Sequence, residues 1–305
     1  MTLGLKAWLL TARTPFLPLS AILVCVGASL AGYEGFFNLS HFLLALAGLM
    51  LAHVSVNTLN EYFDYKSGVD LHTVKTPFSG GSGVLPAGLL KPSSVLRLGL
   101  ASFILASAVG VYFLAAVGWM LLPILLLGGF FTLLYSNFLA RVMAGEVSAG
   151  LGMGALPVLG AYYVHTGFYS LNAFLTAVPS GILVFNLLLL NEFPDVEADL
   201  KGGRRNLVTA FGRRKAAMIY SASTLTVYLF IVLCVFQGLF PASTLLALLT
   251  LPFALKAMAG SLRSHGSLEK LVPALKANVV VVLATQGLLA VGYLAAALAG
   301  LGGLL

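Results

Sequence analysis

Charge is what this sequence has least of. Only 9% of its 305 residues are charged, against about 25% in ordinary globular proteins, and the mean hydropathy is +1.00. Apolar stretches of about 20 residues recur along the whole chain, with short polar breaks between them. The low charge therefore excludes a soluble domain of ordinary size, and the sequence predicts one polytopic membrane domain over residues 1–305.

Cysteine is also scarce. The two cysteines, Cys25 and Cys234, both lie inside apolar runs, which gives no support to a disulfide framework.

The apolar run after the basic N-terminus has no convincing cleavage site, so we expect a retained first span. No metal-site spacing links the five histidines, which are His41, His53, His72, His165 and His265.

The apolar segments predict an all-α integral membrane protein with nine transmembrane helices. Their expected ranges are 14–32, 39–65, 93–114, 118–137, 144–164, 171–196, 212–236, 241–261 and 273–299. All 17 Lys and Arg residues lie before the first span or around alternate gaps, and the gaps near 33–38, 115–117, 165–170 and 237–240 contain none. The positive-inside rule therefore places the N-terminus in the cytoplasm and the C-terminus on the opposite side of a prokaryotic inner or plasma membrane.

The net charge of +7 is first of all a topology signal, and it gives little support to a nucleic-acid partner. Nine of the ten acidic residues share the basic side, although the orientation rule does not govern acids; the exception is Glu34. A separate cause must have gathered the acids there.

The first acidic cluster is NTLNEYFDYKSGVD, at the inner end of the second predicted span. At about 100° per residue, four of its polar residues fall on one helical face, and Gly68 is expected to end the helix before a loop that carries Asp70. The residues of this face are Asn57, Asn60, Glu61 and Asp64.

The second cluster spaces Asn191, Asp195 and Asp199 by four, which predicts a similar helical face, with Pro194 kinking or ending the helix. An aspartate at membrane depth costs at least about 2.5 kcal/mol, and like charges four residues apart repel. Both clusters therefore indicate a polar cavity or bound cations. The alternative is a pair of solvated helix ends that happen to be acidic.

Carboxylate and amide oxygens suit Mg²⁺, which usually completes its coordination with water and phosphate oxygens. This preference points to a diphosphate ligand. Lys201, Arg204 and Arg205 follow the second cluster and can bind phosphate, although anchoring at the membrane explains each of them equally well. The glycine-rich stretch from Thr76 to Pro92 predicts a lid or an anion-binding loop, but it lacks the ending of a P-loop.

At these residues the chain resembles the UbiA superfamily of intramembrane prenyltransferases, and the resemblance extends over most of its length. NEYFDYKSGVD and DVEAD match the two Asp-rich motifs of that family. Glu61 stands where the family has aspartate, and the spacing from Asp64 to Asp70 is similar to that of the menaquinone branch. Lesser matches are RTPFLP at 13–18, YSNFLAR at 135–141 and GE at 145–146.

The resemblance implies a UbiA-type bundle with a cytoplasmic-side active-site cavity. It also implies Mg²⁺-dependent transfer of a polyprenyl group from a polyprenyl diphosphate to an aromatic acceptor. The resemblance is greatest to the enzymes that use 1,4-dihydroxy-2-naphthoate as the acceptor in menaquinone synthesis. The isoprenoid tail is expected to lie among apolar helices that are open to membrane lipid. A 4-hydroxybenzoate or lipid acceptor remains an alternative. A secondary transporter is an alternative from another class, although it would place its acids nearer mid-span.

The same resemblance assigns roles to individual residues. For Tyr135 a position at the membrane interface is the favoured alternative, and Glu146 could equally pair with Arg141. The implied metal ligands are Glu61, Asp64, Asp70, Asp195 and Asp199. The implied catalytic residues are Asp64, Asp195, Asp199, Tyr135 and Glu146. The implied substrate contacts are Asn57, Asn60, Asn191, Arg13, Lys66, Arg141, Lys201, Arg204 and Arg205.

Overall fold

The computed structural model describes residues 3–72, 80–264 and 266–301, and all regular structure within them is helical. Eight helical segments in these residues are long and apolar enough to cross a membrane: Thr14–Tyr33, Leu39–Ser67, Pro92–Ala116, Gly145–Thr166, Leu171–Asn191, Leu207–Phe236, Ala242–Ser264 and Leu268–Leu298. The remaining predicted span corresponds to a shorter apolar segment, Trp119–Leu134. The all-helical membrane architecture is thus confirmed, and the count of nine spans stays a prediction.

The α-helices have the following bounds: α1 Leu3–Thr11, α2 Pro18–Tyr33, α3 Leu39–Ser67, α4 Val69–His72, α5 Pro92–Ala116, α6 Leu122–Leu134, α7 Gly145–Gly150, α8 Leu156–Thr166, α9 Leu171–Asn191, α10 Val196–Lys201, α11 Leu207–Phe236, α12 Leu251–Ser264 and α13 Leu268–Leu298. A π-helical turn, Leu151–Ala155, joins α7 to α8, and a 3₁₀ segment, Ala242–Thr250, precedes α12.

The largest departure from the predicted helices lies at the second acidic cluster. A single helix over 171–196 was expected, but α9 ends at Asn191 and α10 begins only at Val196. Pro194 lies in the intervening turn. Proline disfavours the helical conformation of the residue before it and has no N–H to donate, which explains the break. The expectation that Pro194 kinks or ends the helix is therefore confirmed, and the face predicted for Asn191, Asp195 and Asp199 is divided by the turn.

The first cluster is closer to its prediction. Its Asn/Asp face lies on the continuous helix α3, and Gly68 caps that helix with φ 81°, a left-handed conformation that glycine adopts without strain. The residue expected in a loop, Asp70, instead lies in the short helix α4.

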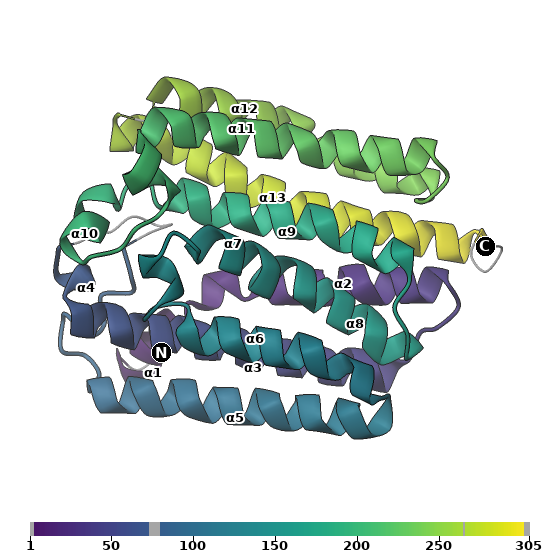
Figure 1. Ribbon diagram of the computed structural model, residues 1–305, viewed down its shortest axis with the longest axis horizontal. Helices are drawn as coiled ribbons and strands as arrows, with labels where there is room; N and C mark the ends of the chain where they lie inside the picture. Colours follow the sequence, from purple (N-terminus) through teal and green to yellow (C-terminus); the bar gives the residue numbers. More distant parts are fainter. Residues whose placement is uncertain (1–2, 73–79, 265, 302–305) are drawn as a thin grey trace.

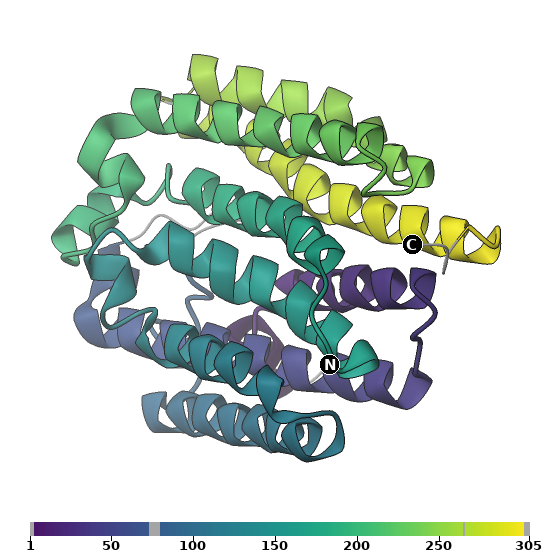
Figure 2. The ribbon, with the colours of Figure 1, turned by 45° about the vertical axis from the view of Figure 1, so that its right-hand side comes forward.

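The long helices run side by side, and α4 and α10 lie at one end of the bundle while the C-terminal end of α13 lies at the other (Figure 1). The helix pairs in extensive contact include α3 with α5, α2 with α8 and with α13, α9 with α11, and α12 with α13. Seen after the rotation in Figure 2, α11, α12 and α13 still form one side of the bundle and α3, α5 and α6 the other. The acidic segments on α3 and after α9 are thus brought to the same end of the bundle.

Close helix packing holds this arrangement together. A Cβ added at Gly154 would lie 2.7 Å from the Ser180 carbonyl oxygen, and one at Gly292 would lie 2.6 Å from the Cα of Thr244. Small residues that let helix backbones approach closely are typical of membrane bundles. Buried polar side chains are paired between helices, as in the 2.7 Å hydrogen bond between Thr176 and Tyr293.

Candidate active site

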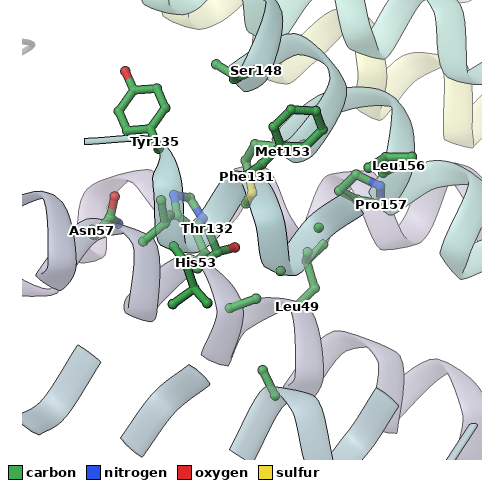
Figure 3. A pocket seen from close by; sticks show the side chains of 18 of the residues that line it. Leu49, His53, Asn57, Phe131, Thr132, Tyr135, Ser148, Met153, Leu156 and Pro157 are labelled. Carbon is green, nitrogen blue, oxygen red and sulfur yellow. The ribbon is translucent and has the colours of Figure 1, made fainter. Parts of the chain in front are cut away.

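One cavity of about 800 Å³ collects both acidic clusters. Its polar end is lined by residues of both clusters and by the arginine that follows the second: Asn57, Asn60, Asp64, Asp70, Asn191, Asp195, Asp199 and Arg204. Its remaining wall is largely apolar and comes mainly from α3, α5, α6 and α8, with further residues from α2 and α9. Figure 3 shows part of that wall, with Leu49, His53 and Asn57 of α3 beside the cavity together with Phe131 of α6. The cavity therefore offers a polar head region and an apolar body.

The Asn face of α3 is fixed by hydrogen bonds to neighbouring segments. Asn57 Nδ2 donates to the Ala12 carbonyl at 3.1 Å. Asn60 Oδ1 accepts from Arg13 Nη2 at 3.0 Å, and its Nδ2 donates to Ser136 Oγ at 3.0 Å. These bonds tie the N-terminal segment and the end of α6 to α3, and they hold the amides in place at the edge of the cavity.

Glu61 bonds to the glycine-rich loop and lies outside the cavity lining. Its carboxylate is fully buried and does not line the cavity; it accepts hydrogen bonds from both the backbone N–H, at 3.1 Å, and the hydroxyl of Ser82. Arg13 Nη2 lies 3.6 Å from it. In this conformation Glu61 ties down the glycine-rich loop, and its placement lends no support to the predicted role as a metal ligand.

Asp70 is the acid that the glycine-rich loop covers. Its Oδ2 is buried without a hydrogen-bond partner among the described residues. Burial, with the nearby charges of Asp64 and Glu61, raises the pKa of Asp70 to about 7. Gly81 has φ +66°, and a Cβ there would lie 2.7 Å from Asp70 Oδ1, so only glycine lets the loop approach so closely. Residues 73–79, which include the start of the predicted lid, lie outside the described residues.

The second cluster is held by its own turn and by α11. Asp195 occupies the N-cap position of α10, and Asp199 lies within that helix, buried, with Oδ2 accepting from Asn206 Nδ2 at 2.8 Å. Burial raises the pKa of Asp199 to about 6. Asn206 also caps α11 through a capping box with Thr209. The carbonyl oxygen of the Asn191 side chain is buried and has no hydrogen-bond partner in the described chain.

Arg204 joins the two clusters. One of its guanidinium nitrogens, Nη2, donates to Asp64 Oδ1, and the other, Nη1, lies 3.7 Å from Asp199 Oδ1. Of the three basic residues predicted to bind phosphate here, Arg204 alone lines the cavity, while Lys201 and Arg205 are exposed. The sequence alone does not distinguish the three residues, because the directions of their side chains depend on the turn after α10.

The other predicted contacts divide in the same way. Arg13 lines the cavity from a left-handed backbone conformation, φ 50°, which is uncommon for a residue other than glycine. Lys66 is exposed, with its ammonium 6.0 Å from the centre of the Tyr62 ring, and Arg141 is exposed; neither lines the cavity. Their placement gives no support to substrate contact.

Tyr135 and Glu146 have contrasting positions. Tyr135 lines the cavity (Figure 3), and burial raises the pKa of its hydroxyl, which therefore remains a proton-bearing donor. Glu146 is fully buried outside the lining, and its Oε1 accepts from the Leu207 N–H at 2.6 Å. The structure records no ion pair between Glu146 and Arg141 in the described chain, so the carboxylate acts on the start of α11.

Two titratable residues that line the cavity, Glu192 and His53, have no role predicted from the sequence. Glu192 lines the cavity in the turn after α9, where burial, followed by the charge of Glu146, raises its pKa well above the usual range. His53 lines the cavity from α3, one turn before Asn57. Position on the face of the first cluster was the available signal for His53, since residues four apart on a helix share a face.

The polar end fits a divalent hard cation. The lining offers carboxylate and amide oxygens, including the unpartnered oxygens of Asp70 and Asn191. Among the described residues no three His, Cys, Asp or Glu side chains lie close enough to bind one ion. A cation bound by one or two carboxylates, with water and phosphate as its other ligands, matches this donor set, and that is the usual coordination of Mg²⁺.

Comparison with known proteins identifies the family. Residues 20–279 match the profile of the UbiA prenyltransferase family. The chain belongs to this family. It is therefore a prenyltransferase and an integral membrane protein, and the transporter alternative loses its support.

Relatives within the UbiA family include the 1,4-dihydroxy-2-naphthoate octaprenyltransferase of Bacillus subtilis (strain 168), 30% identical over 89% of this chain and 86% of the relative. The fold is similar to the apo structure of a UbiA homologue from Aeropyrum pernix K1, with TM-score 0.71 and 17% identity over 90% of this chain and 96% of the homologue. It is also similar to a UbiA homologue from Archaeoglobus fulgidus bound to GPP and Mg²⁺, with TM-score 0.63 and 15% identity over 93% and 99%.

Proposed function

We propose that this prenyltransferase transfers a polyprenyl group from a polyprenyl diphosphate to 1,4-dihydroxy-2-naphthoate, in menaquinone synthesis. The observation that carries the proposal is the single cavity in which Asp64, Asp199 and Arg204 meet at the polar end of an apolar chamber. A diphosphate suits the polar end and an isoprenoid chain suits the apolar wall. The naming of the Bacillus subtilis relative supports the naphthoate acceptor.

The chemistry needs charge stabilisation where the donor breaks. The C–O bond to the diphosphate breaks, and the leaving group takes the bonding electron pair. A ring carbon of the acceptor forms the new C–C bond with the allylic cation and then releases the proton or carboxyl group that it carried. The carboxylates of Asp64, Asp70, Asp195 and Asp199 are the candidates to hold Mg²⁺, one or two to an ion, and the bound metal would supply positive charge beside the departing oxygens.

The residues of the chain act around that step. The guanidinium of Arg204 can donate two hydrogen bonds to phosphate oxygens, and Arg13 lies at the same end of the cavity. The protonated hydroxyl of Tyr135 can donate to a phosphate oxygen or face the cation. Stabilisation directed at charge that develops as the bond breaks lowers the barrier more than uniform binding does.

The membrane placement is part of the proposal. We infer a single domain of nine spans, in which Trp119–Leu134 crosses the bilayer as the fourth, in a prokaryotic inner or plasma membrane. The distribution of Lys and Arg supports a cytoplasmic N-terminus and cavity mouth and a C-terminus on the other side. Reporter fusions after residues 35, 168 and 301 test this orientation, because all three should report the side opposite to the cytoplasm.

The function is tested with purified protein in detergent and lipid. Mg²⁺, a series of polyprenyl diphosphates and either 1,4-dihydroxy-2-naphthoate or 4-hydroxybenzoate are supplied, and diphosphate release and prenylated product are measured. We expect prenylated naphthoate, dependent on the metal. Product with 4-hydroxybenzoate alone would redirect the proposal to the other acceptor, and absence of product from every acceptor would refute it.

A further inference from the structure

A single histidine interrupts the apolar wall below the acidic clusters. His53 lines the cavity from α3, and its side chain is only 5% exposed. On the same helix Leu49, Ala52 and Val56 line the cavity around it. His53 precedes Asp64 by eleven residues, which corresponds to about 16 Å along the helix axis. This depth leaves room for a diphosphate and an aromatic ring between the two side chains.

A hydrogen bond to the neighbouring helix α2 fixes the orientation of the His53 imidazole. Its Nδ1 forms a 2.8 Å hydrogen bond with the hydroxyl of Ser20, a fully buried residue of α2. The Ser20 oxygen can accept from Nδ1–H, and in that tautomer Nε2 carries a free lone pair. The structure records no hydrogen bond from Nε2 to any described residue. An imidazole nitrogen without a partner in an apolar wall is costly, and a bound ligand that hydrogen-bonds to it removes the cost.

Only one part of the proposed substrates can supply that hydrogen bond. The isoprenoid chain has no polar group, and the diphosphate belongs with the acids and Arg204 at the end of the cavity. The aromatic acceptor carries ring hydroxyls. A hydroxyl that donates to Nε2 releases more electron density into the ring, which favours attack on an allylic cation.

We propose that His53, positioned by Ser20, is the binding contact for a ring hydroxyl of the aromatic acceptor. The proposal rests on the proposed function and assigns the acceptor ring to the stretch of cavity between Asp64 and His53. His53 is the residue that touches substrate, and Ser20 acts through it as a positioning residue.

The test compares His53→Ala with wild type in binding as well as turnover. Affinities are measured for 1,4-dihydroxy-2-naphthoate and for analogues that lack either the 1-hydroxyl or the 4-hydroxyl. We expect the variant to bind the dihydroxy compound about three- to tenfold more weakly, with the KM for the polyprenyl diphosphate unchanged within about twofold. For the analogue that lacks the contacted hydroxyl, wild type and variant should bind equally, as a double-mutant cycle between enzyme and ligand requires.

Three further variants separate contact from packing. His53→Gln keeps a polar group at a similar distance from the backbone and should restore part of the affinity for the acceptor. This variant still tests the contact if the alanine variant unfolds. Ser20→Ala should weaken acceptor binding in the same direction by a smaller factor. His41→Ala is the matched control, because His41 lies near the other end of the same helix and does not itself line the cavity; it forms a hydrogen bond with the Val164 carbonyl. Its acceptor affinity should equal that of wild type.

The failures of the two proposals look different. If wild-type protein binds the dihydroxy and deoxy compounds equally, or if His53→Ala weakens all of them alike, the hydroxyl contact is overturned. A raised KM for the polyprenyl diphosphate in the variant overturns it as well. Failure of the proposed function appears in the wild type instead, as absence of any prenylated aromatic product.

Discussion

The acidic segment on α3 and the one that follows α9 contain the same residue types, and the protein presents them by different means. On α3, Asn57, Asn60 and Asp64 project from an uninterrupted helix, and their position follows from helical geometry. After α9 the helix breaks, and Asp195 and Asp199 are held by a turn, a six-residue helix and the side chain of Asn206. One half of the site is a rigid helical face and the other half is an assembled loop.

This difference shows where the site depends on distant contacts. The α3 half needs only its own helix to set the spacing of its carboxylate and amides. The α9–α10 half needs Asn206 and Arg204, which come from the following turn, to set the direction of Asp199. Arg204 then joins the halves by contacting Asp64 and Asp199 together. We expect substitutions in the two halves to have distinguishable effects on activity and on stability.

The strongest test asks whether the halves form one site. Asp64→Asn and Asp195→Asn should each lower kcat by about 100-fold or more, because each removes a negative charge needed to hold the cation beside the diphosphate. Turnover is measured as diphosphate release with saturating Mg²⁺, and folding is checked by thermal unfolding in detergent. Glu197→Gln is the matched control, since this acid lies between Asp195 and Asp199 and is exposed. Full activity in both aspartate variants would contradict the metal assignment.

The next test concerns the residue that links the halves. Arg204→Ala should lower kcat/KM for the polyprenyl diphosphate by about 10- to 100-fold, the effect of losing charged hydrogen bonds to phosphate. Arg205→Ala removes the same charge from the next position, where the side chain is exposed, and should change kcat/KM by less than about twofold. Equal losses in the two variants would mean that general positive charge, and no specific contact, attracts the donor.

A smaller effect is expected where the loop covers the first half. Gly81 and Gly88 have the same φ of +66°, so alanine introduces similar backbone strain at both. Only at Gly81 would the new Cβ meet the Asp70 carboxylate, whereas at Gly88 no atom lies within 4 Å. Gly81→Ala should therefore lower activity by about tenfold through displacement of Asp70 or the loop, and Gly88→Ala should leave it nearly unchanged. Matching activities in the two variants would rule out the close approach as a requirement.

The smallest effect concerns stability in the second half. Asn206→Ala removes the side-chain cap of α11 and a hydrogen bond to Asp199, and should lower the free energy of unfolding by about 0.5–2 kcal/mol. Ser267→Ala is its control, because Ser267 occupies the N-cap of α13 without a side-chain capping bond. Denaturant unfolding in detergent should show a change within about 0.5 kcal/mol for the control. A similar loss in both would contradict the capping assignment.

Much of the first half could be predicted and much of the second could not. The face of α3 follows from residue spacing along one helix, so sequence placed Asn57, Asn60 and Asp64 on a shared surface. After Asn191 the four-residue spacing of the acids is not enough to place them, because the helix breaks at Pro194, as its conformational restriction predicts, and the direction of Asp195 and Asp199 then depends on the turn. Glu61 matched a family position by sequence, yet its carboxylate bonds to Ser82, a contact that no local pattern announces.

What the sequence determined by itself is the membrane-spanning class, the gathering of basic residues around alternate gaps and the presence of two acidic clusters. These properties follow from composition and from the length of the apolar runs, because the free energy of transfer into the bilayer is largely a sum over individual residues. The tertiary structure decided which basic residue enters the cavity, which acids face it and where a lone histidine meets the apolar wall. Those choices depend on side chains that approach across long stretches of chain, as Arg204 and Asp64 do over 140 residues, and only packing of the whole bundle brings them together.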